Sequence, residues 1–125
     1  MSKKSSINYS QNLIDALNKL PSPIYDERHD LTVYLDNDKA RSNQTRLEHI
    51  AKVTHNLKVK DIESIPRGIK KESRVKKDSF KKSTFNYYFP RESNKKEFIK
   101  ISVLVDKNNK KKVTIKTIFV AKQMK

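Results

Sequence analysis

Apolar residues recur at helical spacing in two N-terminal segments of the chain. The first begins at Gln11 and ends before the PSP sequence at 21–23, because proline disfavours helix at the residue before it. The second runs from about 39 to 57, after Asn37 and Asp38, which are suited to cap it. A further short helical segment is expected at 60–64. The apolar faces of the two main helices comprise Leu13, Ile14, Leu17 and Leu20 in the first, and Leu47, Ile50, Ala51, Val53 and Leu57 in the second.

β-forming residues predict strands at 30–36, 83–89, 97–106 and 113–121. The last two segments flank the turn sequence KNNKKK and are expected to pair as a hairpin. The chain therefore predicts one α+β domain over residues 11–125, after a flexible N-terminus at 1–10. In this fold one or two N-terminal helices pack on one face of a mostly antiparallel, roughly four-stranded sheet.

Strict alternation divides the predicted hairpin into two faces. The apolar face, expected to lie under the helices, holds Ile99, Ile101, Val103, Val105, Val113, Ile115, Phe119 and Ala121. The other face holds Phe98, Lys100, Ser102, Thr114, Lys116, Ile118 and Val120. Lys100 and Lys116 thus lie on the open side, beside the aromatic segment FNYYFPR at 85–91. Tyr88 and Arg91 of that segment, with the two lysines, are predicted to bind nucleic acid. Protection of a sheet edge is the alternative role for the lysines.

The chain is strongly basic: its 125 residues include 29 Lys and Arg against 14 Asp and Glu, a formal net charge of +15. Such an excess predicts a polyanionic partner, with RNA preferred and DNA as the alternative. Eight of the basic residues fall in the segment 67–82, which is expected to be a mobile loop. Lys76, Lys77, Lys81 and Lys82 are its predicted nucleic-acid contacts.

Composition also excludes several classes of function. The chain has no cysteine, so disulfides, thiolate metal sites and cysteine nucleophiles are excluded. Its single glycine, Gly68, leaves no glycine-rich phosphate loop. We expect neither a metal nor a cofactor. No segment resembles a signal peptide or a membrane span, so a cytoplasmic location without a membrane partner is expected.

The segment RLEHIAKVTH at 46–55 contains an arginine and two of the three histidines. Arg46 and His49 are three residues apart and therefore neighbours on a helix. His55 is six residues beyond His49, so a continuous helix does not direct both rings to one point. A helix ending near Val53 or Thr54 would allow His55 to turn back towards His49.

The ordered segments LTVYLD, RLEHIAKVTH, DIESIP, NYYF, FIKISVLV and KKVTIKTIFVAK resemble the phage-associated branch of the barnase–EndoU–colicin–RelE superfamily of ribonuclease toxins. The resemblance covers about residues 30–121. It implies metal-independent RNA cleavage in which the ribose 2′-hydroxyl is the nucleophile, and an immunity or antitoxin protein as a partner. The matching positions are Arg46, His49, His55 and Thr117, as acid, base and phosphate-stabilising groups. By alternation Thr117 falls on the apolar face, which leaves a bulge, an inverted sheet or a structural role as alternatives.

Two functions follow as competing hypotheses. The first is an endoribonuclease, encoded by a phage or mobile element, with its chemistry in the 46–55 segment. The second is a non-catalytic nucleic-acid-binding accessory protein, in which the loop at 67–82 supplies most of the affinity. A third, an inhibitor that mimics nucleic acid, is disfavoured because most such mimics are acidic.

Overall fold

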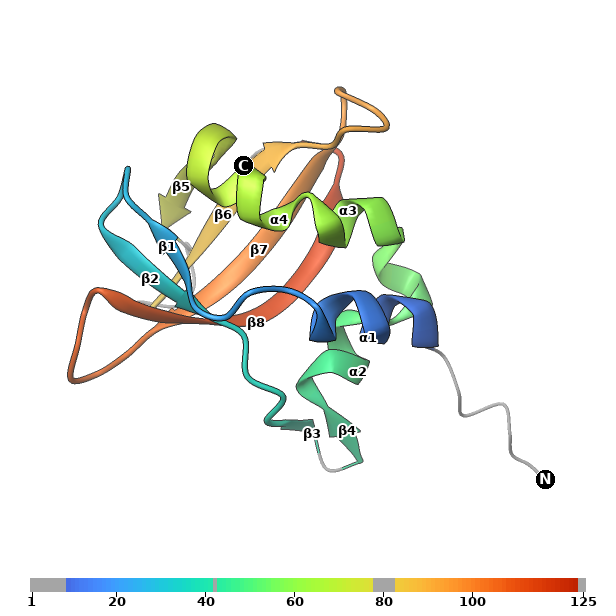
Figure 1. Ribbon diagram of the computed structural model, residues 1–125, viewed down its shortest axis with the longest axis horizontal. Helices are drawn as coiled ribbons and strands as arrows, with labels where there is room; N and C mark the ends of the chain where they lie inside the picture. The colour runs from blue at the N-terminus through green and yellow to red at the C-terminus, as the bar shows by residue number, and fades with distance from the viewer. Residues whose placement is uncertain (1–8, 42, 78–82, 124–125) are drawn as a thin grey trace.

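The computed structural model describes residues 9–41, 43–77 and 83–123 and has an α+β fold (Figure 1). Most of the predicted flexible N-terminus, and Lys81 and Lys82, lie outside these ranges. Along the chain the elements are α1 (Gln11–Asn18), β1 (Ile24–Asp26), β2 (Leu31–Tyr34), β3 (Lys39–Arg41), β4 (Gln44–Thr45), α2 (Arg46–Ile50), the 3-10 helix η2 (Val53–His55), α3 (Val59–Glu63), α4 (Ile65–Arg67), the π-helix η3 (Gly68–Glu72), β5 (Arg74–Lys77), β6 (Thr84–Pro90), β7 (Phe98–Val105) and β8 (Lys112–Ala121). No helix among the described residues is long and apolar enough to cross a membrane.

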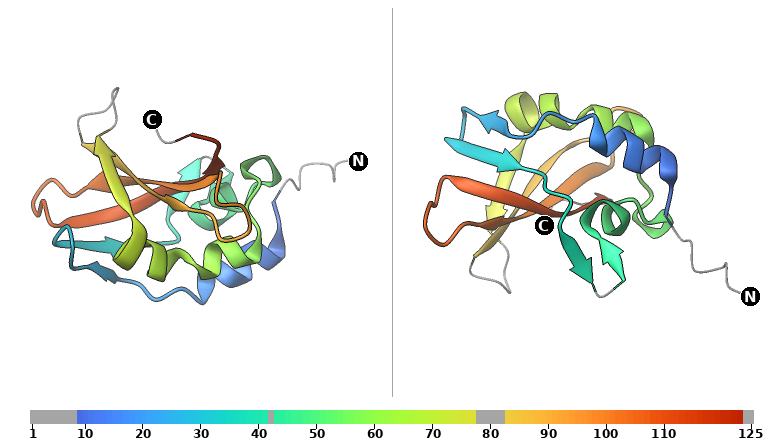
Figure 2. Two further views of the ribbon diagram at one scale, coloured as in Figure 1. Left: turned by 90° about the horizontal axis from the view of Figure 1, so that it is seen from above. Right: turned by 60° about the horizontal axis from the view of Figure 1, so that its bottom comes forward.

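The main sheet has six strands in the order β1-β2-β8-β7-β6-β5, and not the four expected from the sequence. It is mixed, because β2 pairs with β8 in parallel, whereas the other neighbours are antiparallel. The sheet is also curled: the Tyr87 hydroxyl on β6 donates to the carboxylate of Asp26 on β1 at 2.6 Å, although three strands separate β6 from β1. Helices α1, α3 and α4 cover one face of the sheet (Figure 2).

The predicted helix at 39–57 is wrong over most of its length. Residues 39–45 form the β3–β4 hairpin, and α2 begins only at Arg46. Thr45 and Glu48 form a capping box, in which each side chain accepts a hydrogen bond from the other residue's backbone N–H. This local motif fixes the start of the helix, which ends after five residues, so that η2 then turns His55 back.

The predicted basic loop is partly regular structure. Its first residues complete α4 and η3, and residues 74–77 form the edge strand β5. Gly68 is required where η3 packs on β6, since a Cβ atom there would lie 2.5 Å from the buried ring of Phe89. Close packing of η3 on the sheet therefore positions both Glu72 and Arg74, which begins the next strand.

Alternation predicted the core correctly as far as Ile115 and failed beyond it. Ser102 pairs with Thr117, whereas the next residue, Val103, pairs with Ile115. Lys116 is therefore the extra residue of a β-bulge, and it inverts the faces of the rest of β8. As a consequence Ile118 is buried in the core, while Thr117, Phe119 and Ala121 lie on the side away from the helices.

Candidate active site on the open face of the sheet

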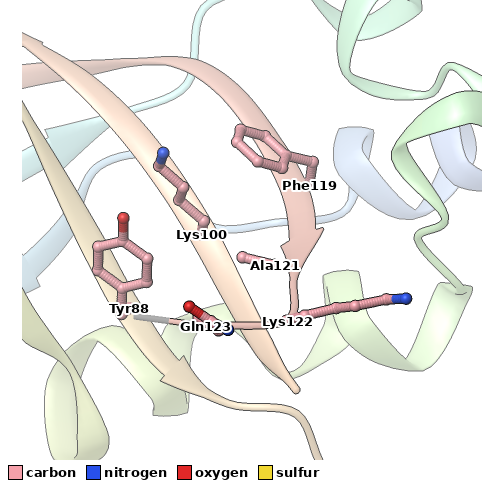
Figure 3. A pocket seen from close by; sticks show the side chains of 6 residues that line it. All are labelled: Tyr88, Lys100, Phe119, Ala121, Lys122 and Gln123. Atoms are coloured by element: carbon pink, nitrogen blue, oxygen red, sulfur yellow. The ribbon is translucent and has the colours of Figure 1, made fainter. Parts of the chain in front are cut away.

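The face of the sheet opposite helices α1, α3 and α4, here called the open face, carries a row of side chains that crosses four strands. Residues directly opposite each other in antiparallel strands project to the same face. Arg74 on β5 pairs with Tyr88, Tyr88 with Lys100, and Lys100 with Phe119 on β8. We call these four residues the cross-strand row; Figure 3 shows its last three members side by side. Cations and aromatic rings alternate along it.

Lys100 is the centre of this row. Its ammonium nitrogen lies 5.1 Å from the centroid of the Phe119 ring and 5.7 Å from that of Tyr88. Both distances suit cation–π attraction, which holds the charge over the open face. No ion pair with a carboxylate is present for Lys100 among the described residues. Its charge is therefore available to an anionic ligand.

Two hollows flank Tyr88. The first, of about 360 Å³, is lined by Tyr88, Lys100, Phe119, Ala121, Lys122 and Gln123 (Figure 3). The second, of about 410 Å³, is lined by Glu72, Arg74, Tyr88, Pro90 and Phe98. Tyr88 is only 2% exposed, so its ring is the wall between the hollows and not a free platform for stacking. Both volumes are in the range of small-ligand sites.

Two histidines extend the row beyond Phe119. The ring of His55 lies 5.9 Å from that of Phe119, and the ring of His49 lies 5.6 Å from that of His55, edge to face. The short α2 and the turn through η2 thus bring together the two histidines that one continuous helix would separate. His49 also contacts Gln44, with 3.3 Å between its Nδ1 and the amide oxygen.

His55 is fixed by backbone carbonyl groups. Its Nδ1 lies 2.9 Å from the carbonyl oxygen of Ile118 and 3.1 Å from that of Ile50. Because a carbonyl only accepts, Nδ1 carries the proton, and Nε2 of the neutral ring is left as a base. Burial lowers the pKa of His55, against the opposing effect of the two carbonyls. The ring is therefore neutral, and able to accept a proton, at neutral pH.

Arg46 also binds the backbone of β8, and its guanidinium is occupied by protein groups. Only residues 112–114 of β8 pair with β2, so the edge beyond them has no strand beside it. Nη1 of Arg46 donates to the carbonyl of Lys116 at 2.9 Å, and Nε donates to the Asp38 carboxylate at 2.9 Å. The hydrogen bond from Arg46 lowers the pKa of Asp38. Arg46 is 9% exposed and thus caps the strand edge, next to the histidines but not open to a ligand.

Two further predicted residues lie near the bulge. Thr117 is half-buried on the open face, opposite Ser102, whose hydroxyl donates to the amide oxygen of Asn86 at 2.6 Å. Of the alternatives for Thr117, the bulge is the one observed. The Lys116 ammonium lies 3.8 Å from the Asp38 carboxylate, so its charge is shared with that group.

The remaining predicted contacts are divided by the fold. Lys76 lies on the open face, whereas Lys77 pairs with Phe85 and projects to the opposite side. Arg91 is 8% exposed and forms ion pairs with Asp61 at 2.9 Å and Glu97 at 2.8 Å. Its guanidinium closes the packing of α3 against the end of β6 and has no face for a ligand. No cluster of three or more His, Cys, Asp or Glu side chains in the described ranges could hold a metal ion.

Sequence reasoning missed Arg74, Glu72 and Phe119 on the open face. Phe119 was assigned to the core because alternation was continued through β8. The misplacement of Thr117 was the available signal, since a bulge that moves Thr117 outward moves Phe119 with it. Comparison with known proteins finds no family model, no curated protein and no solved structure that matches the chain.

Proposed function

We propose that the chain is an endoribonuclease that needs no metal ion and cleaves RNA on the open face, beside His49 and His55. The observation that carries this proposal is the contact between the two imidazoles next to Phe119, with Nδ1 of His55 held by carbonyl groups. An oriented neutral imidazole beside a second imidazole supplies a base and an acid within reach of one phosphodiester.

The proposed reaction assigns one proton transfer to each histidine. Nε2 of His55 accepts the proton of the ribose 2′-hydroxyl, whose oxygen forms a bond to phosphorus. The bond between phosphorus and the 5′-oxygen breaks, and His49 donates a proton to that oxygen. The products are a 2′,3′-cyclic phosphate and a free 5′-hydroxyl, so atoms and charge balance without a further reactant.

Charge on the open face supports the same reaction. The phosphorane that forms during attack carries more negative charge than the substrate, and Lys100 is placed to stabilise it. Lys116 adds a partly shared charge, and the Thr117 hydroxyl is a hydrogen-bond donor on the same face. The ring of Phe119 between Lys100 and His55 offers a surface on which the base beside the scissile phosphate stacks.

The test is cleavage of end-labelled RNA in EDTA by the wild-type chain and by His49→Ala. We expect cleavage by the wild type, a loss of at least 100-fold in His49→Ala, and similar RNA binding by both. Val53→Ala is the matched control, because Val53 is 60% exposed in the adjacent η2 and has no proposed role. Equal cleavage by wild type and His49→Ala contradicts the proposal.

A second candidate function is binding of nucleic acid, RNA or DNA, without catalysis. It is favoured by one observation: Arg46 and His55 both satisfy carbonyl groups on the uncovered edge of β8, which is a sufficient structural reason for them. In this case RNA stays intact with every variant. Replacing Lys76, Lys77, Lys81 and Lys82 by Ala then weakens binding and reduces its salt dependence.

A further inference from the structure

The second hollow, on the far side of Tyr88 from the histidines, combines groups of complementary hydrogen-bonding character. Glu72 contributes a carboxylate, which only accepts, and Arg74 contributes a guanidinium, which only donates. Pro90, Phe98 and the wall of Tyr88 provide its apolar surface. A planar, polar, aromatic ligand matches this lining.

The two charged groups are unpaired within the described part of the chain. Glu72 and Arg74 line the same hollow, yet neither forms an ion pair or side-chain hydrogen bond with the other or with another described residue. Elsewhere in the protein, acidic and basic side chains this close to each other are joined, as Arg91 is to Asp61. The opposite charges in the hollow therefore remain available for a ligand that places donors towards one and acceptors towards the other.

We infer that this hollow binds guanine in preference to the other bases. Guanine has two adjacent donors, N1–H and the N2 amino group, that match the two oxygens of one carboxylate. It also has two adjacent acceptors, O6 and N7, that match a guanidinium. Adenine and cytosine each present a single amino group, and uracil a single N–H, so none of them offers the paired donors.

The position of the hollow relates this inference to the proposed function, on which it rests for the identity of the polymer. Arg74, Tyr88, Lys100 and Phe119 are consecutive partners across four strands, which are about 4.8 Å apart. The hollow is therefore about two strand spacings from the Phe119 ring, with Lys100 between them for the intervening phosphate. Cleavage a short, fixed distance from a guanine is the expected consequence.

The test is titration of the full chain, followed by NMR, with guanosine 3′-monophosphate and with the adenosine, cytidine, uridine and inosine analogues. We expect the guanosine nucleotide to bind about tenfold or more tightly than the adenosine, cytidine and uridine ones. Inosine should be intermediate, because it lacks the N2 amino group. Glu72→Gln should remove the preference, whereas Glu63→Gln, an exposed carboxylate on α3, should leave it unchanged.

Wild-type selectivity decides the inference even where Glu72→Gln folds poorly: equal binding of all five nucleotides overturns it. The same titration separates the two proposals. Guanine-selective binding without any RNA cleavage retains the base site and refutes the nuclease, whereas cleavage at all bases alike, with no guanine preference in binding, does the reverse.

Discussion

Arg91 and Arg74 lie beside the same strand, β6, and differ in every respect that matters for binding. Arg91 follows the strand and is enclosed by Asp61, Glu97 and the carbonyl of Asn56. Arg74 pairs with Tyr88 across the strand, is exposed, and has no ion-pair partner among the described residues. A net charge of +15 counts the two arginines alike. The fold separates cations that hold the protein together from cations that are available to a ligand.

The largest effect is expected from breaking the enclosed cluster. Arg91→Ala leaves the carboxylate of Asp61, which is 3% exposed, without its counter-charge. Removal of one partner of a buried pair typically costs about 3–5 kcal/mol in the free energy of unfolding. Arg74→Ala should change it by less than about 0.5 kcal/mol. Urea unfolding of both variants measures the difference, and equal effects would show that the distinction between the two arginines is wrong.

A second comparison contrasts a buried tyrosine with an exposed one. The Tyr87 hydroxyl donates to the fully buried carboxylate of Asp26, which also accepts from His29 at 2.7 Å. Tyr87→Phe should lower the free energy of unfolding by about 1–3 kcal/mol, because a buried acceptor loses a donor. Tyr25→Phe, at a half-exposed tyrosine bonded to Asp30, should cost less than about 0.5 kcal/mol in the same urea experiment.

On the open face, the comparison is sharpened by two lysines of equal charge. Lys100→Ala should weaken binding of single-stranded RNA and reduce the slope of log affinity against log salt concentration by about 0.7, the value for one phosphate contact. Lys107→Ala, in the exposed turn between β7 and β8, makes the same change in charge away from the row. Equal losses of slope would mean that binding senses only net charge.

The smallest effect concerns the pH dependence contributed by His55. Burial lowers its folded-state pKa, so between that pKa and the ordinary value of about 6.5 the unfolded chain binds more protons. The stability that this group contributes is complete above about pH 6.5 and is lost as pH falls through the folded-state pKa. His55→Asn keeps a donor near the Nδ1 position and removes the titration. Unfolding measured from pH 7.5 to 5.5 should therefore decline more for wild type than for His55→Asn, and parallel curves would contradict this account.

The sequence predicted the parts of the fold that depend on local pattern. Helix α1 and the β7–β8 hairpin follow from the spacing of residues such as Leu13, Ile101 and Val113, which are buried as expected. The parallel pairing of β2 with β8 could not be predicted, because it joins segments far apart in the chain through a register that no local signal encodes. The strand β1 is only three residues long and carries no alternating pattern.

For the candidate site, the sequence indicated the residue types better than their positions. His49 and His55 were selected, but their contact depends on a helix of five residues and a 3-10 turn, which the apolar spacing to Leu57 concealed. Phe119 was assigned to the wrong face because the bulge at Lys116 changes the period of β8. The enclosure of Arg91 depends on Asp61, thirty positions earlier, and only the tertiary fold brings them together.

The most direct test of the central claim is the chemistry of the RNA ends. A short oligoribonucleotide and its 2′-O-methylated counterpart would be incubated with the chain in EDTA, and their products analysed by mass spectrometry. The account predicts fragments ending in a 2′,3′-cyclic phosphate and a 5′-hydroxyl from the first, and no cleavage of the second. An intact ribonucleotide, or cleavage that does not need the 2′-hydroxyl, would contradict it.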